Sequence, residues 1–161
     1  MIAGSLDINE IQGESKKDGV EDQIDVFGVH WRVRQKDFAR EGAGLTQGRG
    51  EVSSFTFHKY CDAASAYLAQ AAMQGKALPE VIFTARKDSG DEYIDYLIVT
   101  MSNCVISDFE MENDGNDPSN SLIKEKVAIA CDKIAIKYTV QEEDGSSGGE
   151  HEFEYDIKAG A

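Results

Sequence analysis

The segment at residues 92–101, EYIDYLIVTM, is apolar on both faces of the strand that its residue types favour. Side chains alternate across a strand, so Ile94 and Ile98 lie on one face while Leu97 and Val99 lie on the other. A strand in a small antiparallel sheet usually presents one polar face to water. Something other than water must therefore cover the second face, and this requirement limits the folds that the chain can adopt.

Residues 62–79, DAASAYLAQAAMQGKALP, form the one helix that the sequence predicts. We expect Asp62 to be the N-cap, Gly75 to follow the last helical residue, and Pro79 to prevent continuation. No side chain from Ala63 to Gly75 is charged, although a surface helix normally has one polar face. The far side of this helix therefore also needs a cover, which suggests an interface between subunits.

Period-two patterns predict strands through most of the remaining chain. These strands are expected at residues 5–9, 23–33, 51–59, 80–87, 93–101, 104–112, 122–131, 133–141 and 150–158. Many short strands with one helix are typical of a small barrel or sandwich. We therefore expect a mainly β fold, a small closed β-barrel of two packed antiparallel sheets with a flanking helix.

The chain of 161 residues has no linker composition, and we expect a single domain over residues 1–161. In the second predicted strand the apolar phase changes after Val26, which indicates a bulge or a strand covered on both sides. Residues 35–50 carry four glycines and are long for a hairpin connection, so we expect an extended functional loop. Residues 142–161 form an acidic C-terminal segment.

Thirty acidic residues against sixteen basic ones give a formal net charge of −14. This balance argues against nucleic acid and anionic membranes as partners, because both bind basic surfaces. No segment is apolar for long enough to insert into a membrane, and the first residues lack a cleaved signal peptide, so we expect folding in the cytoplasm. Cys61, Cys104 and Cys131 are expected to be reduced, buried thiols.

Weak chemical motifs do not add up to an active site. The alternating acids at 108–114 and 150–156 are typical of solvated strand faces, and EMENDGND lacks the final glutamate of a calcium loop. His58 and Cys61 have no second pair of ligands at matching spacing, and GAGLTQG departs from the dinucleotide fingerprint. We therefore expect no catalytic residue, no cofactor and no metal site.

Five segments in succession carry a family resemblance. They are IQGES, IDVFGVHW, FTFHKYCDAASAYLAQAAMQGK, YIDYLIVTM and EKVAIACDKIAIKYTVQ. Together with the glycine-rich loop, they resemble the haemolysin-coregulated protein (Hcp) family, the tube protein of bacterial type VI secretion. The resemblance runs from Leu6 to Gln141 and leaves the acidic C-terminal segment unmatched.

The resemblance implies a homo-hexameric ring of β-barrels, stacked head-to-tail into a tube. A contractile sheath drives this tube, with a spike protein at its tip, out of the bacterium during competition or virulence. Effector proteins travel in the lumen, where the tube protein acts as carrier and chaperone. The protein is then made in the cytoplasm and secreted without a cleaved signal peptide.

The same resemblance suggests two sets of contact residues. Neighbouring subunits would cover the helix and the two-faced strand, through Tyr67, Leu68, Met73, Leu97 and Val99. The extended loop would contact the adjacent ring, through Lys36, Asp37, Arg40, Glu41 and Arg49.

Two other classes of function remain open at this point. A small-ligand-binding β-barrel would be a monomer or dimer with an apolar cavity. A hydrolase or metalloenzyme would use one of the weak motifs described above.

Overall fold

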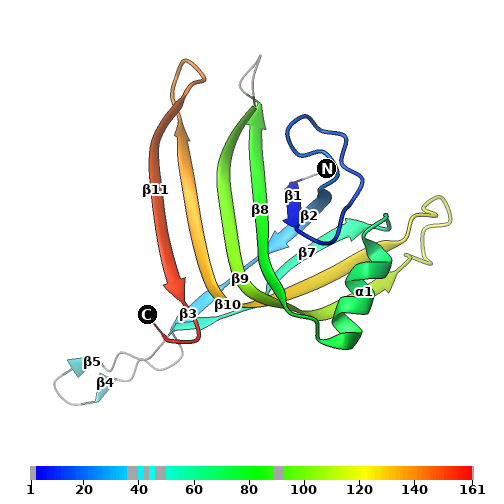
Figure 1. The fold of residues 1–161 in the computed structure, drawn as a ribbon, viewed down its shortest axis with the longest axis horizontal. Coiled ribbons are helices and arrows are strands. Elements are labelled where there is room, and N and C mark those ends of the chain that lie inside the picture. The colour runs from blue at the N-terminus through cyan, green and yellow to red at the C-terminus, as the bar shows by residue number, and fades with distance from the viewer. Residues whose placement is uncertain (1–2, 36–39, 42–43, 46–49, 89–92, 161) are drawn as a thin grey trace.

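The computed structural model describes residues 3–35, 40–41, 44–45, 50–88 and 93–160. These residues form one helix, α1 (Ser65–Gln74), and eleven strands (Figure 1). The strands are β1 (Gly4–Ile8), β2 (Ile24–His30), β3 (Val33–Gln35), β4 (Arg40–Glu41), β5 (Gly44–Leu45), β6 (Gly50–Val52), β7 (Phe55–Tyr60), β8 (Leu78–Asp88), β9 (Tyr93–Glu112), β10 (Lys124–Gln141) and β11 (Ser147–Asp156).

Six strands close into an antiparallel barrel in the order β10-β7-β2-β1-β8-β9, and the pairing of β9 with β10 completes the circle. The strand β11 pairs with β10 at the edge of this sheet. In Figure 1, β8 to β11 form a curved wall, β1 lies to the right of β8 with β2 and β7 below it, and α1 lies beside the barrel. The expected mainly β barrel with one flanking helix is confirmed.

Two pairs of predicted strands are each continuous in the structure. The strand β9 passes through Asn103 and β10 passes through Asp132, where the sequence predicted breaks. Asn103 has a positive φ of 52°, and the β9–β10 register shifts between Ala128 and Ile129. The predicted breaks are wrong because such irregularities bend a strand while its ladder continues on both sides.

The core of the barrel consists of inward-facing residues from every barrel strand. Its members include Leu6, Ile24, Phe57, Val81, Met101 and Ile129. Burying each such side chain contributes about 1.5–3 kcal/mol relative to leaving it in water. In the two-faced segment of β9, Val99 and Met101 belong to this core, whereas Ile98 lies half-buried on the opposite face.

The C-terminus of α1 forms as its sequence predicts. Gly75 adopts the left-handed conformation with φ of 59°, and its N–H donates to the carbonyl oxygen of Ala72. The next N–H, of Lys76, donates to the carbonyl oxygen of Ala71. These two bonds are those of a Schellman motif, which favours glycine because a side chain would strain the left-handed backbone.

The N-terminus of α1 differs from the prediction that Asp62 is the N-cap. The helix begins at Ser65, so its N-cap position is Ala64, which offers no side-chain hydrogen bond. Asp62 lies in the preceding turn, where its Oδ1 accepts from the N–H of Ala64 at 2.9 Å. The same Oδ1 lies 2.8 Å from Nζ of Lys59, and this contact holds Asp62 one turn before the helix proper.

Of the two explanations offered for the phase change in the second strand, a bulge is present in β2. The register between β2 and β7 shifts between Phe27 and His30, and Gly28 has a positive φ of 58°. A Cβ atom on Gly28 would lie only 2.6 Å from Cδ2 of His58. Both the backbone conformation and this close approach therefore favour glycine.

Candidate subunit interface

Large apolar side chains remain exposed at several places, among them α1, the sheet beyond the barrel, and the connection between β9 and β10. In the part of the chain that the structure describes, they are Val33, Tyr60, Tyr67, Met73, Tyr93, Val105, Met111, Leu122, Ile123, Tyr138 and Phe153. Isolated exposed residues of this kind are normal, but clusters of them usually mark interaction surfaces. Two of these clusters are organised by regular secondary structure.

The first cluster is the outward side of α1, which we call the helix surface. It consists of Ala66, Tyr67, Gln70, Met73 and Gln74, all of them exposed. Tyr67 is 58% exposed and Met73 is 87% exposed, while no residue of this surface is charged. The opposite side of the helix buries Ser65, Leu68 and Ala71. The helix is therefore attached to its own barrel on one side and has an uncharged, partly apolar surface on the other.

A buried polar network holds the start of α1 on the barrel. Lys59 of β7 and Glu125 of β10 are register partners, both with 0% exposure, and Lys59 Nζ lies 2.7 Å from Glu125 Oε1. Lys59 Nζ also donates to Ser65 Oγ at 3.0 Å, and Ser65 Oγ donates to Glu125 Oε1 at 2.9 Å. Asp62 supplies the second carboxylate. These contacts connect two barrel strands to the first residue of the helix.

Charges buried this deeply need partners. Moving an ion out of water costs several kcal/mol, which only close contacts and hydrogen bonds can offset. Lys59 has two carboxylates and two further oxygen acceptors, whereas Glu125 Oε2 is buried without a hydrogen-bond partner in the described residues. Removing the lysine would therefore leave two carboxylates without their counter-ion. The network thus fixes the position and direction of the helix surface.

The second cluster lies on β10 and β11, which extend the sheet beyond the barrel. In the described residues β11 pairs with β10 alone, so its other edge has no strand partner. On one face lie Tyr138, His151 and Phe153, all exposed, and we call them the β11 surface. Tyr138 is 39% exposed and Phe153 is 52% exposed. An unpaired edge beside exposed aromatic rings is a surface on which another chain can pack.

The other face of the same strands is charged. Glu154 forms an ion pair with Lys133, and Glu150 forms one with Lys137 at 3.2 Å. The hydrogen bond and charge of Glu154 raise the pKa of Lys133 above its ordinary value. Glu150, Glu152 and Glu154 are exposed, which confirms that these alternating acids lie on a solvated face.

The extended loop begins and ends in a short ribbon. The strands β3 and β6 pair with Val33 opposite Val52, and farther along the loop β4 and β5 pair with Arg40 opposite Leu45. Figure 1 shows β4 and β5 away from the barrel. Of the predicted ring-stacking residues, Arg40 and Glu41 belong to β4, and the others (Lys36, Asp37 and Arg49) lie outside the described residues.

The five predicted interface residues separate into two groups. Tyr67 and Met73 are exposed on the helix surface, and Leu97 is half-buried. Leu68 is 0% exposed and Val99 is 5% exposed, because both belong to the chain's own core. We therefore remove Leu68 and Val99 from the interface prediction, since a side chain that one subunit already covers offers no surface to another.

The weak chemical motifs have structural uses in this fold. The described residues contain no group of three or more possible metal ligands. In the loop between β9 and β10, which contains part of EMENDGND, Asp117 Oδ1 accepts from the N–H and hydroxyl of Ser119. These hydrogen bonds lower the pKa of Asp117. His58 stacks against Phe27 at a ring-centroid distance of 5.9 Å.

The expectation of three buried thiols is wrong for Cys61, which is exposed.

The ligand-binding alternative expects an apolar cavity. Instead, the barrel interior holds the core, and a cleft of about 450 Å³ is lined by residues that include Lys16, Lys17 and Arg86. The guanidinium of Arg86 is already engaged by Asp95 at 2.6 Å. The cleft therefore lies on the surface of the barrel among charged side chains, unlike the expected apolar cavity inside it.

Sequence reasoning missed the buried network and the β11 surface. A signal for the network was present, because Lys59 continues the inward phase of Phe55 and Phe57. Glu125 likewise shares its phase with Val127. No comparable signal marked Phe153, because alternation alone does not show whether a strand lies inside a barrel or beyond it.

Comparison with known proteins agrees with this architecture. A family model described as "Type VI secretion system effector, Hcp" matches residues 5–138. The curated protein hcp1 of Pseudomonas aeruginosa is 27% identical over 144 residues, which cover 89% of this chain and 87% of that protein. No helix in the described part of the chain has the length and apolarity needed to cross a membrane.

Solved structures show the same fold. A structure titled as a type six secretion system protein has a TM-score of 0.90 at 21% identity, covering 100% of this chain and 99% of the other. The crystal structure of Hcp1 from Salmonella typhimurium has a TM-score of 0.79 at 25% identity, with coverage of 100% and 99%. Because the family model spans most of the sequence and the barrel agrees, this chain belongs to the Hcp family of the type VI secretion system.

Proposed function

We propose that this protein assembles into six-subunit rings that stack head-to-tail into an exported tube. The Hcp family is one of structural tube proteins, not of enzymes. The observation that carries the proposal is the helix surface, where Tyr67 and Met73 are exposed and no residue of the helix is charged. Exposed apolar side chains forgo about 1.5–3 kcal/mol each relative to burial, so contact between subunits stabilises the assembly.

The β11 surface supports a ring in particular. A ring requires a head-to-tail contact, in which one surface of each subunit meets a different surface of the next. The helix surface and the β11 surface lie on different elements and are both unpartnered in the described chain. Two distinct patches on one chain suit such a heterologous contact better than a two-fold symmetric dimer.

The extended loop is the proposed contact between rings. Its described part leaves the barrel on the β3–β6 ribbon, with Arg34 and Gln35 exposed. Electron microscopy of a variant that lacks residues 37–48 tests this role, with the full chain at the same concentration as control. We expect single rings from the variant and stacked rings from the full chain. Stacked rings from the shortened variant would contradict the proposal.

Export involves a contractile sheath, a spike at the tip of the tube, and effectors carried in the lumen. The protein is made in the cytoplasm and leaves the bacterium without a cleaved signal peptide. The intact mass of the protein from culture medium tests the last point, and we expect the mass of the full sequence. A mass lacking an N-terminal segment, or export from cells without the sheath, would contradict this route.

The proposed transport of effectors in the lumen leads to a separate prediction. An effector enclosed by a ring is shielded from a protease that is too large to enter, whereas a free effector is not. Effector digestion should therefore slow in the presence of assembled protein and stay fast beside a variant that does not assemble. Equal digestion in both samples would exclude the carrier role.

A further inference from the structure

Two cysteines face each other across the centre of the longest strand pair. Cys104 of β9 and Cys131 of β10 are register partners in the antiparallel ladder. Such partners have Cα atoms about 4.5 or 5.5 Å apart, and their side chains point to the same face. Both separations fall within the roughly 4.4–6.8 Å that a disulfide spans. The backbone therefore already holds the two residues at bonding separation.

The pair lies where both long strands bend. The strand β10 pairs with β7 as far as Ile129 and with β11 from Lys133 onward, so Cys131 lies between these two ladders. On β9, Asn103 with its positive φ directly precedes Cys104. A bond between the two sulfurs would therefore join β9 to β10 at the joint between the barrel and the extended sheet.

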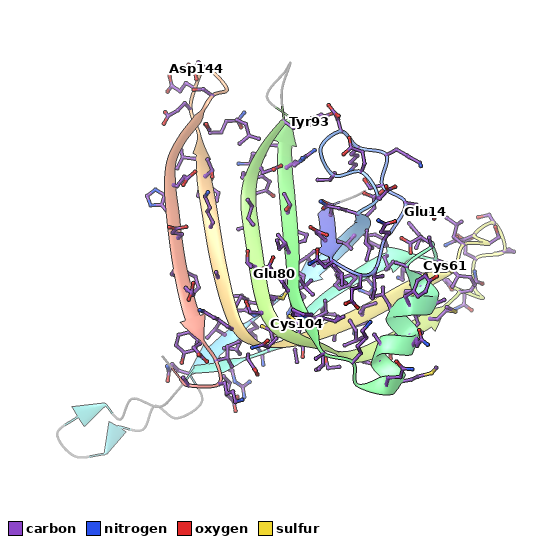
Figure 2. The ribbon with its side chains drawn as sticks, viewed as in Figure 1. Glu14, Cys61, Glu80, Tyr93, Cys104 and Asp144 are labelled. Atoms are coloured by element: carbon purple, nitrogen blue, oxygen red, sulfur yellow. The ribbon has the colours of Figure 1, made fainter. Side chains whose placement is uncertain are left out.

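The two thiols differ in access. Cys104 is 0% exposed and is flanked by β8 on its other side, where Leu78 is its partner. Cys131 is only partly buried and packs against the core. The third cysteine, Cys61, is exposed beside the start of α1, and Figure 2 shows it apart from Cys104. Cys131 is thus the member of the pair that an oxidant reaches first.

Burial also explains why the pair can remain reduced. Burial raises the pKa of Cys104 to about 12, with further contributions from Cys131 and Asp132. Burial and Asp132 raise the pKa of Cys131 as well. Only the thiolate attacks a disulfide, so both groups react slowly at neutral pH.

We propose that Cys104 and Cys131 are an oxidation site, at which a low-molecular-weight disulfide such as oxidised glutathione converts the two thiols into a cross-strand disulfide. The thiolate of Cys131, its proton given to solvent, attacks one sulfur of the oxidant and releases one glutathione thiolate. Cys104 gives its proton to the released glutathione thiolate, its own thiolate attacks Cys131 Sγ, and the second glutathione thiolate leaves and takes up a proton from solvent. The two cysteines lose two electrons in total, and oxidised glutathione gains them as two glutathione molecules. The site stays a dithiol in a reducing cytoplasm and closes in an oxidising exterior.

The experiment uses the full chain carrying Cys61→Ser, which removes the exposed thiol. The folded protein is incubated with oxidised glutathione at mildly alkaline pH, alkylated, and examined by intact mass and by peptide mapping without reductant. We expect the loss of two hydrogen atoms, no alkylation, and one cross-linked peptide pair that contains both cysteines. Cross-linking should raise the thermal unfolding midpoint by about 5–10 °C, and reductant should reverse the shift.

A matched variant carrying Cys131→Ser in addition should show no cross-linked peptide and no shift in midpoint. Two alkylated thiols after oxidation of the folded protein would overturn the proposal. A persistent mixed disulfide of glutathione on Cys131, or a disulfide between two chains, would overturn it as well. None of these readouts depends on ring assembly, so failure of the proposed tube and failure of this site are distinguishable.

Discussion

The closed barrel and the surfaces outside it place charged and apolar side chains in opposite ways. Inside the barrel wall, Lys59 and Glu125 are charged residues at 0% exposure, and they pair with each other through Glu125 Oε1, which also accepts from Ser65. On the extended sheet, Lys133 and Glu154 pair at the surface while Phe153 is 52% exposed. The barrel thus completes its packing within one chain, whereas the β11 surface and the helix surface do not. This difference identifies the two surfaces that we propose other subunits cover.

The largest effect is expected from breaking the buried ion pair. Lys59→Met should lower the free energy of unfolding by about 3–5 kcal/mol, because it leaves the buried carboxylate of Glu125 without its counter-ion. Urea unfolding of the single subunit measures this loss. The double variant Lys59→Met with Glu125→Leu should recover most of it, since only the partly exposed carboxylate of Asp62 then lacks its counter-ion. A double variant as unstable as the single one would contradict this account of the barrel.

Two neighbouring residues of α1 sharpen the comparison. Leu68 is buried in the core, so Leu68→Asp should lower the free energy of unfolding by roughly 3–5 kcal/mol. Tyr67 is exposed, and Tyr67→Asp should change the stability of the isolated subunit by less than about 1 kcal/mol. Both are measured by urea unfolding at a concentration that dissociates any ring. Equal losses would mean that the two sides of the helix are not distinct.

A smaller effect is expected from the buried thiol at alkaline pH. The folded pKa of Cys104 lies near 12, above its ordinary value of 9.0, so its contribution is complete below pH 9.0 and is lost as pH rises toward 12. This loss amounts to at most ~1.4 kcal/mol per pH unit. The variant Cys104→Ala has no thiol to ionise. The free energy of unfolding of the wild type relative to this variant should therefore fall between pH 9.0 and pH 12. A difference independent of pH would contradict the prediction.

The smallest effect is expected from the ion pair on the extended sheet. Lys133→Met should shift the unfolding midpoint far less than Lys59→Met, because water and salt screen an exposed pair. The raised pKa of Lys133 means that, toward alkaline pH, the contribution of the pair is lost as the pH rises through the pKa of the lysine. Unfolding at low and high salt provides the check. A shift in the unfolding midpoint of Lys133→Met that is equally large at high salt would contradict the prediction, because it would show that solvent does not screen this pair.

The fold class could be predicted from the sequence because periodicity reports which faces are buried. The bulge at Gly28 and the end of α1 at Gly75 followed from a phase change and from one glycine. The continuity of β9 and β10 could not be predicted, since Asn103 and Asp132 resemble turn residues until the long-range ladders are known. Asp62 likewise resembled a cap until its contact with Lys59 was visible.

The exposure of the predicted interface residues could be foreseen only in part. The absence of charge on α1 indicated that its far side was unusual, and Tyr67 and Met73 are indeed exposed there. The sequence pattern wrongly places Leu68 and Val99 in the interface. It shows that a side chain is apolar, but it does not show whether the chain's own core or a neighbouring subunit covers that side chain. The sequence pattern places Phe153 on an apolar strand face and does not show that this face is exposed. Its position beyond the barrel depends on pairing between distant segments.

The central claim is that other subunits cover the surfaces that one barrel leaves open. The most direct test is the absolute mass of the purified protein by light scattering, with Tyr67→Asp measured beside it and Tyr67→Phe as the matched control. Six subunits of 17.7 kDa give about 106 kDa, which we expect for wild type and Tyr67→Phe, whereas a folded Tyr67→Asp should approach the mass of one subunit. A wild-type protein that stays monomeric at high concentration would contradict the account.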